Sequence, residues 1–332
     1  QIHNVLSNWE PLVMLAARLR ERWGMPGMSV DTVRAFRDKE IMKQRVRAAG
    51  LRVPKSRRVH TAAQVRETAE EFGYPLILKP IAGAGCADTY EVRSVAELEQ
   101  VLPRLGGLPE ASCEEYIEGE ELTYDTICID GKAKMENVSQ YFPKPLEART
   151  HEWISPIAIS VRDLTQPRLQ AGLALGRAVN DVLKMGDGFT HMEWYLTPKG
   201  EAVFGEIGCR PGGAGLVDQM NYTFDADLFR EWARVCCWGH FEASTERKYN
   251  VGIVFKRAQG WGYITRIEGL QNWLRMCGRW VVEESLLKPG THRRDWKQTQ
   301  TSDGHVVVRH PDWDEALRMC YAAATDIKMY AQ

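Results

Sequence analysis

The sequence predicts a mixed α/β protein assembled from α+β modules. Between residues 53 and 117, segments of strand and helix character follow one another in the order β-α-β-β-α-β. Residues 191–210 are two strand-like segments joined by a turn, and residues 166–183 have the apolar spacing of an amphipathic helix. Strands and helices that alternate in this way are typical of compact modules in which helices cover one face of a sheet.

The composition is that of a globular protein. Of the 332 residues, 44% are hydrophobic and 26% are charged, and the net charge is −1. No block of like charges indicates a nucleic-acid or membrane partner, and no apolar run reaches the roughly 18 residues of a membrane span. The length predicts two or three domains. Eight cysteines with no CxxC pair indicate reduced thiols and a cytoplasmic location.

Two helices are expected at the start of the chain. Residues 8–23 have apolar residues at helical spacing, and Pro11 is tolerated in a first turn. A second helix is expected over residues 29–49, ending at Gly50. No strand precedes these helices for them to pack on, so we expect that upstream residues are absent from this numbering.

The rest of the chain follows as alternating elements. In the module from 53 to 117, strands are expected at 53–59, 76–79, 89–92 and 111–117, and helices at 61–72, with Thr61 as the N-cap, and 94–102. Beyond it we expect strands at 122–129 and 132–140, a mobile loop at 143–152, helices at 166–183 and 225–237, a β-rich stretch over 251–310 and a helix at 312–330 capped by Asp312.

The hairpin over residues 191–210 brings two carboxylates together. Folding it about Lys199-Gly200 pairs Glu193 with Glu206 and His191 with Gly208 on one face. The same register pairs Tyr195 with Phe204 there, and it places Met192 opposite Ile207, Trp194 opposite Gly205 and Leu196 opposite Val203 on an apolar face. Like charges directly across a strand pair are destabilising unless something neutralises them. The pair is either a seat for Mg²⁺, which prefers oxygen ligands, or two aligned glutamates on a solvated face.

Other candidate residues have two interpretations each. Lys79 ends an apolar strand before a small-residue loop, where an ammonium and backbone N–H groups could bind a polyphosphate, although no Walker A motif is present. Glu114 and Glu115 could bind an adenine or a ribose, or be solubility charges on an edge strand. Arg210 could bind a phosphate with its planar guanidinium, or form a surface ion pair. His191 could contact a phosphate or a metal, or be structural.

Taken together, these motifs resemble those of a known superfamily. Asp38-Lys39, the stretch 73–80, Gly83-Ala84-Gly85, the stretch 114–121, His191-Met192-Glu193 and the stretch 206–210 occur in this order. In order and spacing they resemble the ATP-grasp superfamily, from about residue 8 to the end of the chain. The resemblance is greatest to carboxylate–amine ligases with the biotin-carboxylase-like layout, such as L-amino-acid ligases and carnosine synthases.

The resemblance implies a role for individual residues. It implies ATP contacts at Lys39, Lys79, Gly83, Gly85, Glu114, Glu115, Tyr116, Ile117 and Glu121. Within this set, the lysines contact phosphates, the glycines belong to a loop that closes over them, residues 114–117 read adenine through the backbone, and Glu121 lies near the ribose. It also implies that Glu193 and Glu206 bind Mg²⁺, with Mn²⁺ as an alternative ion. Arg210 would steady the transferred phosphate, so that Glu206 and Arg210 are the catalytic candidates.

The fold implied by the resemblance holds ATP between a small lid module and a larger mixed-sheet domain. Residues 1–50 would be a remnant of an N-terminal domain with a linker helix, residues 51–117 the lid, and residues 118–332 the catalytic domain with a β-rich end from about 250. The implied activity is ATP-dependent, ADP-forming ligation of a small carboxylate and an amine, amino acids or peptides, through an acyl phosphate. A homodimer is compatible with this family.

One departure from the family pattern concerns the metal site. Many members have Asn as a further metal ligand where this chain has Gly208. Two other classes remain open at this point, namely an ATP-binding scaffold without activity and a carboxylase that acts through carboxyphosphate. The presence of Lys79, Glu193, Glu206 and Arg210 argues against the scaffold, and no biotin-specific signal supports the carboxylase.

Overall fold

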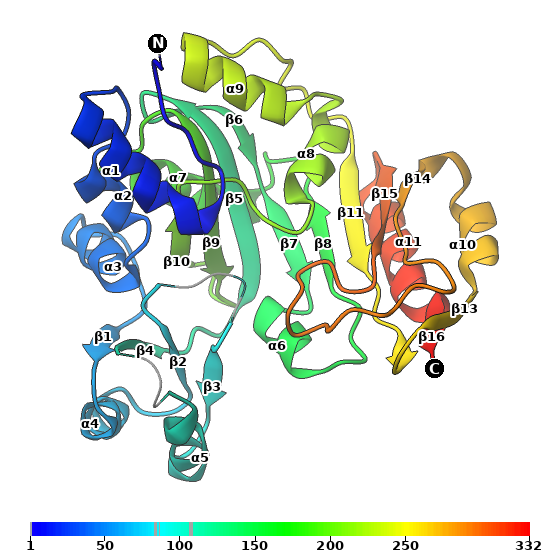
Figure 1. The fold of residues 1–332 in the computed structure, drawn as a ribbon, viewed down its shortest axis with the longest axis horizontal. Coiled ribbons are helices and arrows are strands. Elements are labelled where there is room, and N and C mark those ends of the chain that lie inside the picture. Colours follow the sequence, from blue (N-terminus) through cyan, green and yellow to red (C-terminus); the bar gives the residue numbers. More distant parts are fainter. Residues whose placement is uncertain (1, 83–84, 86, 106–108) are drawn as a thin grey trace. The chain divides into compact units, whose positions relative to one another are not determined.

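The structure is a computed structural model that describes residues 2–82, 85, 87–105 and 109–332. Contacts divide the chain into two compact units (Figure 1). The first unit contains Gln1–Glu136, Pro167–Pro211 and Val235–Gly239, and the second contains Asn137–Gln166, Gly212–Arg234 and His240–Gln332. The domain boundaries predicted at residues 50 and 117 do not coincide with the boundaries of these two units, and they stay a prediction.

The elements of the first unit are η1 (Glu10–Leu12), α1 (Val13–Trp23), α2 (Val30–Ala35), α3 (Lys39–Ala48), β1 (Ser56–Val59), α4 (Ala62–Phe72), β2 (Leu76–Pro80), β3 (Tyr90–Val92), α5 (Val95–Leu105), β4 (Ala111–Glu115), β5 (Glu120–Ile129), β6 (Lys132–Asn137), α7 (Pro167–Val182), β9 (Gly188–Leu196) and β10 (Ala202–Gly208). Those of the second unit are β7 (Ser139–Phe142), α6 (Pro145–Thr150), β8 (Ile157–Ser160), α8 (Leu216–Phe224), β11 (Asn250–Phe255), β12 (Gln259–Gly260), β13 (Ile264–Glu268), α10 (Leu270–Cys277), η2 (Gly278–Trp280), β14 (Val281–Glu284), β15 (His305–His310), α11 (Trp313–Asp326) and β16 (Lys328–Ala331). The helix α9 (Leu228–Trp238) belongs partly to each unit.

A small antiparallel sheet in the first unit has the strand order β1-β4-β2-β3. Successive side chains of β2 point to opposite faces of this sheet. Leu76 and Leu78 therefore enter a core with residues of α4 and α5, whereas Lys79 lies on the other face. Thr61 caps α4 as predicted, because its side chain accepts a hydrogen bond from the backbone N–H of Gln64.

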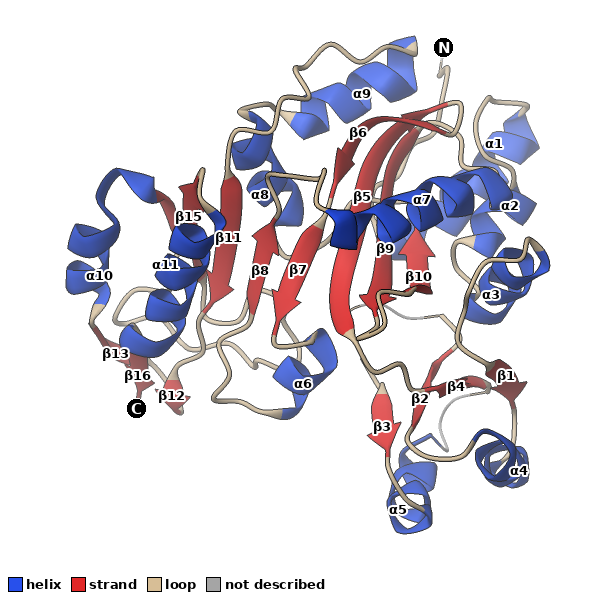
Figure 2. Ribbon diagram, turned by 180° about the vertical axis from the view of Figure 1, so that it is seen from behind, coloured by secondary structure: helices blue, strands red, loops and turns tan. Residues whose placement is uncertain are grey.

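Three further strands of the first unit, in the order β10-β9-β5, carry α7 on one face (Figure 2). Two glycines of α7 allow this close packing. A Cβ on Gly172 would lie 2.2 Å from the Trp194 ring, and a Cβ on Gly176 would lie 2.2 Å from the Tyr124 ring. The opposite face of the three strands is therefore the one on which polar side chains can be presented.

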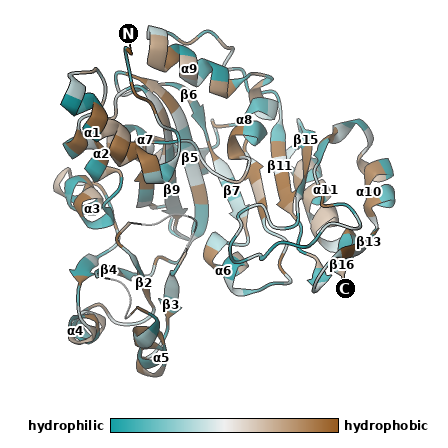
Figure 3. Cartoon of the chain, viewed as in Figure 1, coloured by the Kyte–Doolittle hydropathy of each residue, from teal (hydrophilic) through white to brown (hydrophobic). Residues whose placement is uncertain are grey.

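The second unit contains an antiparallel sheet in the order β7-β8-β11-β15-β14. Alternate residues of β11 enter separate cores on its two faces. Val254 packs with Met319 and other residues of α11, whereas Ile253 packs with Leu216 of α8. Hydrophobic stretches of this sheet lie next to α11 (Figure 3).

Several expectations from the sequence are wrong, and the single strand expected at 132–140 is two strands, β6 and β7. The helix expected over 29–49 is two helices, because Asp38 caps a new helix by accepting hydrogen bonds from the N–H groups of Glu40 and Ile41. The loop expected at 143–152 contains α6, which begins at Pro145, a residue that suits a first helical position. The helix α8 was not expected after the glycine cluster. Finally, residues 328–331 leave the last helix and form β16, which pairs with β12 and β13.

Within the part of the chain that the structure describes, no helix has both the length and the apolar character needed to cross a membrane.

Candidate active site

The site lies on the polar face of β5, β9 and β10. Glu193 of β9 pairs with Glu206 on one side and with Thr123 of β5 on the other. His191 pairs with Gly208 and with Asp125. Residues that are directly opposite in a sheet share a face, so the register alone gathers these polar groups. The predicted opposition of Glu193 and Glu206 is confirmed, as are the pairs formed by His191 and Met192.

The remaining predicted pairs of the hairpin are shifted by one residue. An irregularity at Gly205 places Phe204 opposite Trp194 and Val203 opposite Tyr195, and Leu196 pairs with Ala202. A bulge adds one residue to one strand and so shifts every pair beyond it. A Cβ on Gly205 would lie 2.7 Å from the carbonyl oxygen of Glu193, and the close backbone approach requires glycine.

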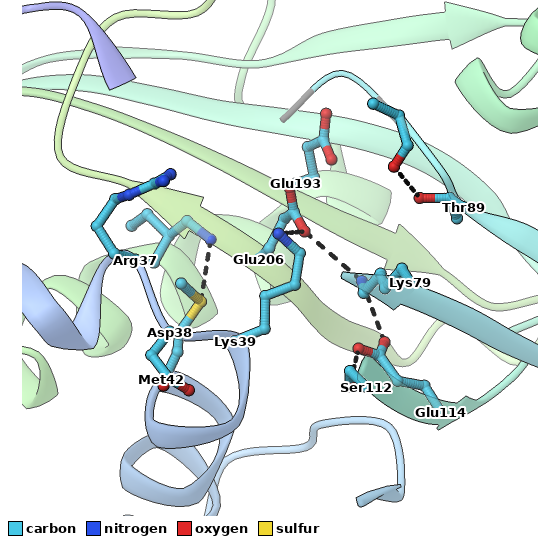
Figure 4. A network of polar contacts seen from close by, with 12 residues as sticks. Arg37, Asp38, Lys39, Met42, Lys79, Thr89, Ser112, Glu114, Glu193 and Glu206 are labelled. Carbon is cyan, nitrogen blue, oxygen red and sulfur yellow. Dashed lines mark hydrogen bonds and ion pairs between the residues drawn. The ribbon is translucent and has the colours of Figure 1, made fainter. Parts of the chain in front are cut away.

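Two lysines from different elements converge on Glu206. Lys39 is the first residue of α3, and its Nζ lies 3.1 Å from Oε2 of Glu206. Lys79 comes from β2, and its Nζ lies 3.6 Å from the same oxygen. Figure 4 shows both ammonium groups directed at Glu206, with Glu193 beside it. The two lysines predicted from the sequence and the predicted carboxylate pair are thus brought together.

This arrangement changes the proton affinities of the groups. Burial alone would raise the pKa of Glu206, but Lys39 and Lys79 outweigh it and hold that pKa well below its ordinary value. Burial alone would lower the pKa of Lys79, but Glu114 and Glu206 outweigh it and raise that pKa. Both groups are therefore charged at neutral pH, and the repulsion expected between Glu193 and Glu206 is partly compensated by ammonium groups.

A second charged cluster lies under the first. Glu114 forms ion pairs with Lys43 of α3 and with Lys79, the latter at 3.1 Å, and accepts a hydrogen bond from the Ser112 hydroxyl at 2.8 Å. Burial opposes the charge of Glu114, but the two lysines lower its pKa to about 2. Burial lowers the pKa of Lys43 to about 8 in spite of Glu114. Glu114 thereby holds the Lys79 ammonium in place between two carboxylates.

His191 is held by a buried carboxylate. Its Nδ1 lies 2.6 Å from Oδ1 of Asp125, whose other oxygen accepts a hydrogen bond from the Thr123 hydroxyl at 2.6 Å. Nε2 of His191 lies 3.7 Å from Glu193. Burial would lower the pKa of His191, but Asp125 outweighs it and raises the pKa to about 9. His191 is consequently an imidazolium at neutral pH, and it adds a positive charge beside Glu193.

Arg210 is held by a residue from the start of the chain. Its Nε donates to the carboxylate of Glu10, which also pairs with Arg37, and its Nη1 donates to the carbonyl oxygen of Pro211 at 2.7 Å. A Cβ on Gly208 would lie 3.3 Å from Oε2 of Glu10. The Glu10 carboxylate therefore lies against the backbone at the position where the sequence departs from the family pattern.

The residues expected at the adenine lie at and beyond the end of β4. The backbone N–H of Glu115 donates to the carbonyl oxygen of Lys55, and its carboxylate pairs with Arg52 at 3.0 Å, so Glu115 joins β4 to the preceding segment. Tyr116 and Ile117 follow the last residue of the strand. Glu121 is buried and pairs with Tyr195 across β5 and β9. Gly85 is exposed with a positive φ of 64°, and Gly83 lies outside the described residues.

The donor set fits Mg²⁺ bound together with phosphates. Among the described residues, no three His, Cys, Asp or Glu side chains are grouped as a complete metal site. Magnesium commonly takes one or two carboxylates and completes its octahedron with water and substrate phosphates. Glu193 and Glu206 are two carboxylates that could hold such an ion, and Lys39 and Lys79 beside them are cations of the kind that pair with phosphates.

Sequence reasoning missed several residues of the site. Lys43 follows Lys39 by one helical turn, so the spacing contained a signal for it. Asp125 alternates with Glu121 and Thr123 along β5, which was a second signal. Nothing in the sequence pattern connects Glu10 with Arg210, because the two residues are 200 positions apart.

Comparisons with known proteins identify a domain family and several relatives. A family model described as ATP-grasp domain matches residues 36–143. The L-arginine-specific L-amino acid ligase of Bacillus subtilis is 24% identical over 90% of this chain and 73% of its own length. The alanine–anticapsin ligase of Bacillus subtilis is 25% identical over 71% of this chain, but the match covers only 54% of that protein.

Solved structures show the same fold. The crystal structure of an L-amino acid ligase from Bacillus licheniformis superposes with a TM-score of 0.80 at 19% identity, covering 100% of this chain and 81% of that one. That of N5-carboxyaminoimidazole ribonucleotide synthetase from Thermotoga maritima superposes with a TM-score of 0.74 at 19% identity, covering 98% and 81%. Residues 36–143 thus match an ATP-grasp domain, and the whole chain has the fold of these solved structures.

Proposed function

We propose that this protein is an ATP-dependent ligase that joins the carboxylate of one amino acid or peptide to the amine of another. The observation that carries the proposal is the convergence of Lys39 and Lys79 on Glu206, directly across from Glu193. Two ammonium groups beside two carboxylates are suited to hold a polyphosphate and its metal ion in one place. The amino-acid ligases among the relatives support the substrate class.

Each residue has a defined task in this proposal. Lys39 and Lys79 turn from Glu206 toward the phosphate oxygens of ATP, which frees the Glu206 carboxylate for the metal ion. Glu193 and Glu206 would hold Mg²⁺, which would supply charge neutralisation at the phosphates. Arg210 binds the transferred phosphoryl group with its planar guanidinium. Phosphoryl transfer depends mainly on positioning and charge stabilisation, so no protein nucleophile is needed.

The reaction proceeds in two steps. A carboxylate oxygen of the first substrate attacks the γ-phosphorus, ADP leaves, and an acyl phosphate forms. The amine of the second substrate then attacks the acyl carbon, loses a proton and displaces inorganic phosphate. One carboxylate oxygen thereby moves from the first substrate into the phosphate released.

This transfer of oxygen provides the decisive experiment. The protein is incubated with Mg·ATP, an amino acid labelled with ¹⁸O in its carboxylate, and a panel of amines, and the phosphate is analysed by mass spectrometry. We expect one ¹⁸O atom in each phosphate released and ADP release that requires both substrates. Unlabelled phosphate would contradict an acyl phosphate derived from the amino acid.

The same experiment separates the competing functions. A carboxylase acting through carboxyphosphate would release ADP when bicarbonate is added, without any amino acid, and ¹⁸O from labelled bicarbonate would appear in the phosphate. A scaffold protein would bind ATP in a calorimeter but release no ADP with any pair. Lys79, Glu206 and Arg210 have the charges that binding of ATP, a metal ion and the transferred phosphate requires. Their presence favours an enzyme over a scaffold protein.

A further inference from the structure

The second unit contains a cavity of about 390 Å³ that the proposed function does not use. Three segments line it, at residues 152–153 and 155, at residues 256–261, and at residues 324–325 and 327–329. Its volume lies within the range of small-molecule pockets, which is roughly 300–1,000 Å³.

Two consecutive residues in the wall of this cavity, Lys256 and Arg257, are cations. Lys256 follows β11, and its Nζ donates to the carbonyl oxygens of Ala323 at 3.0 Å and Ala324 at 2.7 Å. An ammonium has three N–H groups, so one remains beyond these two contacts. Arg257 donates through Nη1 to the carbonyl oxygens of Ala148 at 2.8 Å and His151 at 2.9 Å. In the described part of the chain, neither cation is hydrogen-bonded to a carboxylate.

The cavity consequently has surplus positive charge. Glu152 is the acidic residue of its wall, and its carboxylate is already paired with the buried Arg293 at 2.8 Å. Burial lowers the pKa of Lys256 to about 8 in spite of Asp326, and that of Arg257 to about 10 in spite of Glu152 and Asp303. An anion placed against them would relieve this cost.

Two tryptophans line the same cavity with their side chains in solvent. Trp153 is 79% exposed and Trp261 is 76% exposed. His151 packs edge-on against Trp153, and Arg293 lies over the Trp261 ring. The Trp261 turn is fixed against β16, because a Cβ on Gly260 would lie 2.1 Å from the carbonyl oxygen of Ala331. Exposed indoles offer flat apolar surfaces to a ligand.

We propose that this cavity binds an amino acid or short peptide with a free carboxylate and an aromatic side chain. The carboxylate lies against Lys256 and Arg257, and the aromatic group packs on Trp153 or Trp261. A planar carboxylate matches both donors, whereas an amine would meet two positive charges. The restriction to amino acids and peptides rests on the proposed function, and the carboxylate and aromatic requirements rest on the cavity.

Calorimetric titration without ATP tests the two requirements separately. The probes are L-phenylalanine, L-phenylalaninamide and L-alanine. We expect L-phenylalanine to bind at least tenfold more tightly than either of the other two. Lys256→Met should remove the advantage of the acid over the amide, and Trp153→Ala should reduce the advantage over alanine. Lys199→Met and Trp238→Ala, at exposed positions elsewhere, are the matched controls and should change neither.

The outcomes are decisive even if Lys256→Met does not fold. Trp153 is exposed, so its removal leaves the core intact, and unchanged preference for phenylalanine in Trp153→Ala and in Trp261→Ala would overturn the proposal. Equal affinity for the acid and the amide would also overturn it, as would the absence of binding by all three probes.

Measurements of ADP release then show whether the bound amino acid is a substrate or an effector. If the bound amino acid is a substrate, Lys256→Met raises its KM and leaves the KM for ATP unchanged. If it is an effector, it changes the rate without being consumed. Binding without ADP release from any pair would retain the cavity site and contradict the ligase function. If the protein releases ADP but the cavity variants keep the same KM values and the same binding, the ligase function is retained and the cavity site is contradicted.

Discussion

The Glu10 carboxylate accepts a hydrogen bond from Nε of Arg210, joining η1 to the segment that follows β10. Together with the Pro211 carbonyl, it uses two of the five guanidinium N–H groups. The contacts with Glu10 and Pro211 fix the Nε and Nη1 atoms of Arg210, and they thereby set the direction in which its Nη2 atom points. This geometry makes Glu10 a positioning residue for Arg210, the arginine proposed to bind the transferred phosphate.

Glu10→Gln tests this positioning. The variant keeps the size of the side chain but loses its charge, so Arg210 loses a charge-assisted hydrogen bond. We expect kcat to fall roughly tenfold, and calorimetric ATP affinity to change by less than about twofold, since such bonds contribute about 1.5–3 kcal/mol. Glu246→Gln, at an exposed position, is the control. A rise in kcat would show that Glu10 competes with the phosphate for Arg210.

Arg210→Lys should lower turnover far more than ATP binding. Lysine keeps the positive charge but cannot form the bidentate contact with a phosphoryl group. We expect a loss of at least about tenfold in ADP release, with ATP affinity measured by calorimetry nearly unchanged. Arg37→Lys is the matched control because Arg37 shares the Glu10 carboxylate. Equal losses in affinity and turnover would make Arg210 an ordinary nucleotide contact.

Glu206→Gln should abolish ATP turnover and also lower the stability of the protein without ligands. From the sequence alone, relief of repulsion with Glu193 predicts unchanged or slightly higher stability. The ion pairs with Lys39 and Lys79 reverse that expectation, because the substitution leaves two largely buried ammonium groups with less compensation. We expect a loss of roughly 1–3 kcal/mol in urea unfolding.

The control for this substitution is Glu201→Gln on the same hairpin, whose carboxylate is more exposed and lies 3.8 Å from Arg52. Stabilisation by Mg·ATP should shrink in Glu206→Gln and persist in Glu201→Gln. Magnesium-dependent ADP formation at the normal rate by Glu206→Gln would remove Glu206 from the metal site.

The His191–Asp125 pair predicts a pH dependence of stability. Asp125 raises the pKa of His191 from its ordinary 6.5 to about 9, so the folded state binds its proton more tightly than the unfolded state. The stabilisation is complete below pH 6.5 and is lost as the pH rises toward 9. We expect the unfolding free energy to decrease by on the order of 1–2 kcal/mol between pH 6 and pH 8.

His191→Gln should flatten this part of the profile when urea unfolding is followed at several pH values. His60→Gln, at an exposed position, should retain the slope. If the slope is the same in all three proteins, another group is responsible for it.

Much of the site could be predicted from the sequence because its determinants are local. Strand periodicity is enough to place Glu193 and Glu206 on one face of the hairpin, although their direct opposition also depends on the extra residue at Gly205. The N-caps at Thr61 and Asp312 are likewise local, since a capping side chain bonds to an N–H three residues away. The order of the motifs along the chain also identified the ATP-grasp fold, which the comparisons confirm.

Only the tertiary structure decided which charges meet. The contacts between Glu10 and Arg210 and between Lys43 and Glu114 join segments far apart in the sequence, and no periodicity relates them. The bulge at Gly205 depends on how closely two backbones approach, and no residue spacing encodes that distance. Helix, strand and capping propensities act within a few residues. The charges that neutralise a buried group depend on which segments pack together in the fold. The sequence by itself therefore determined that two carboxylates share one face of the hairpin, and the fold determined their exact register and the cations that neutralise them.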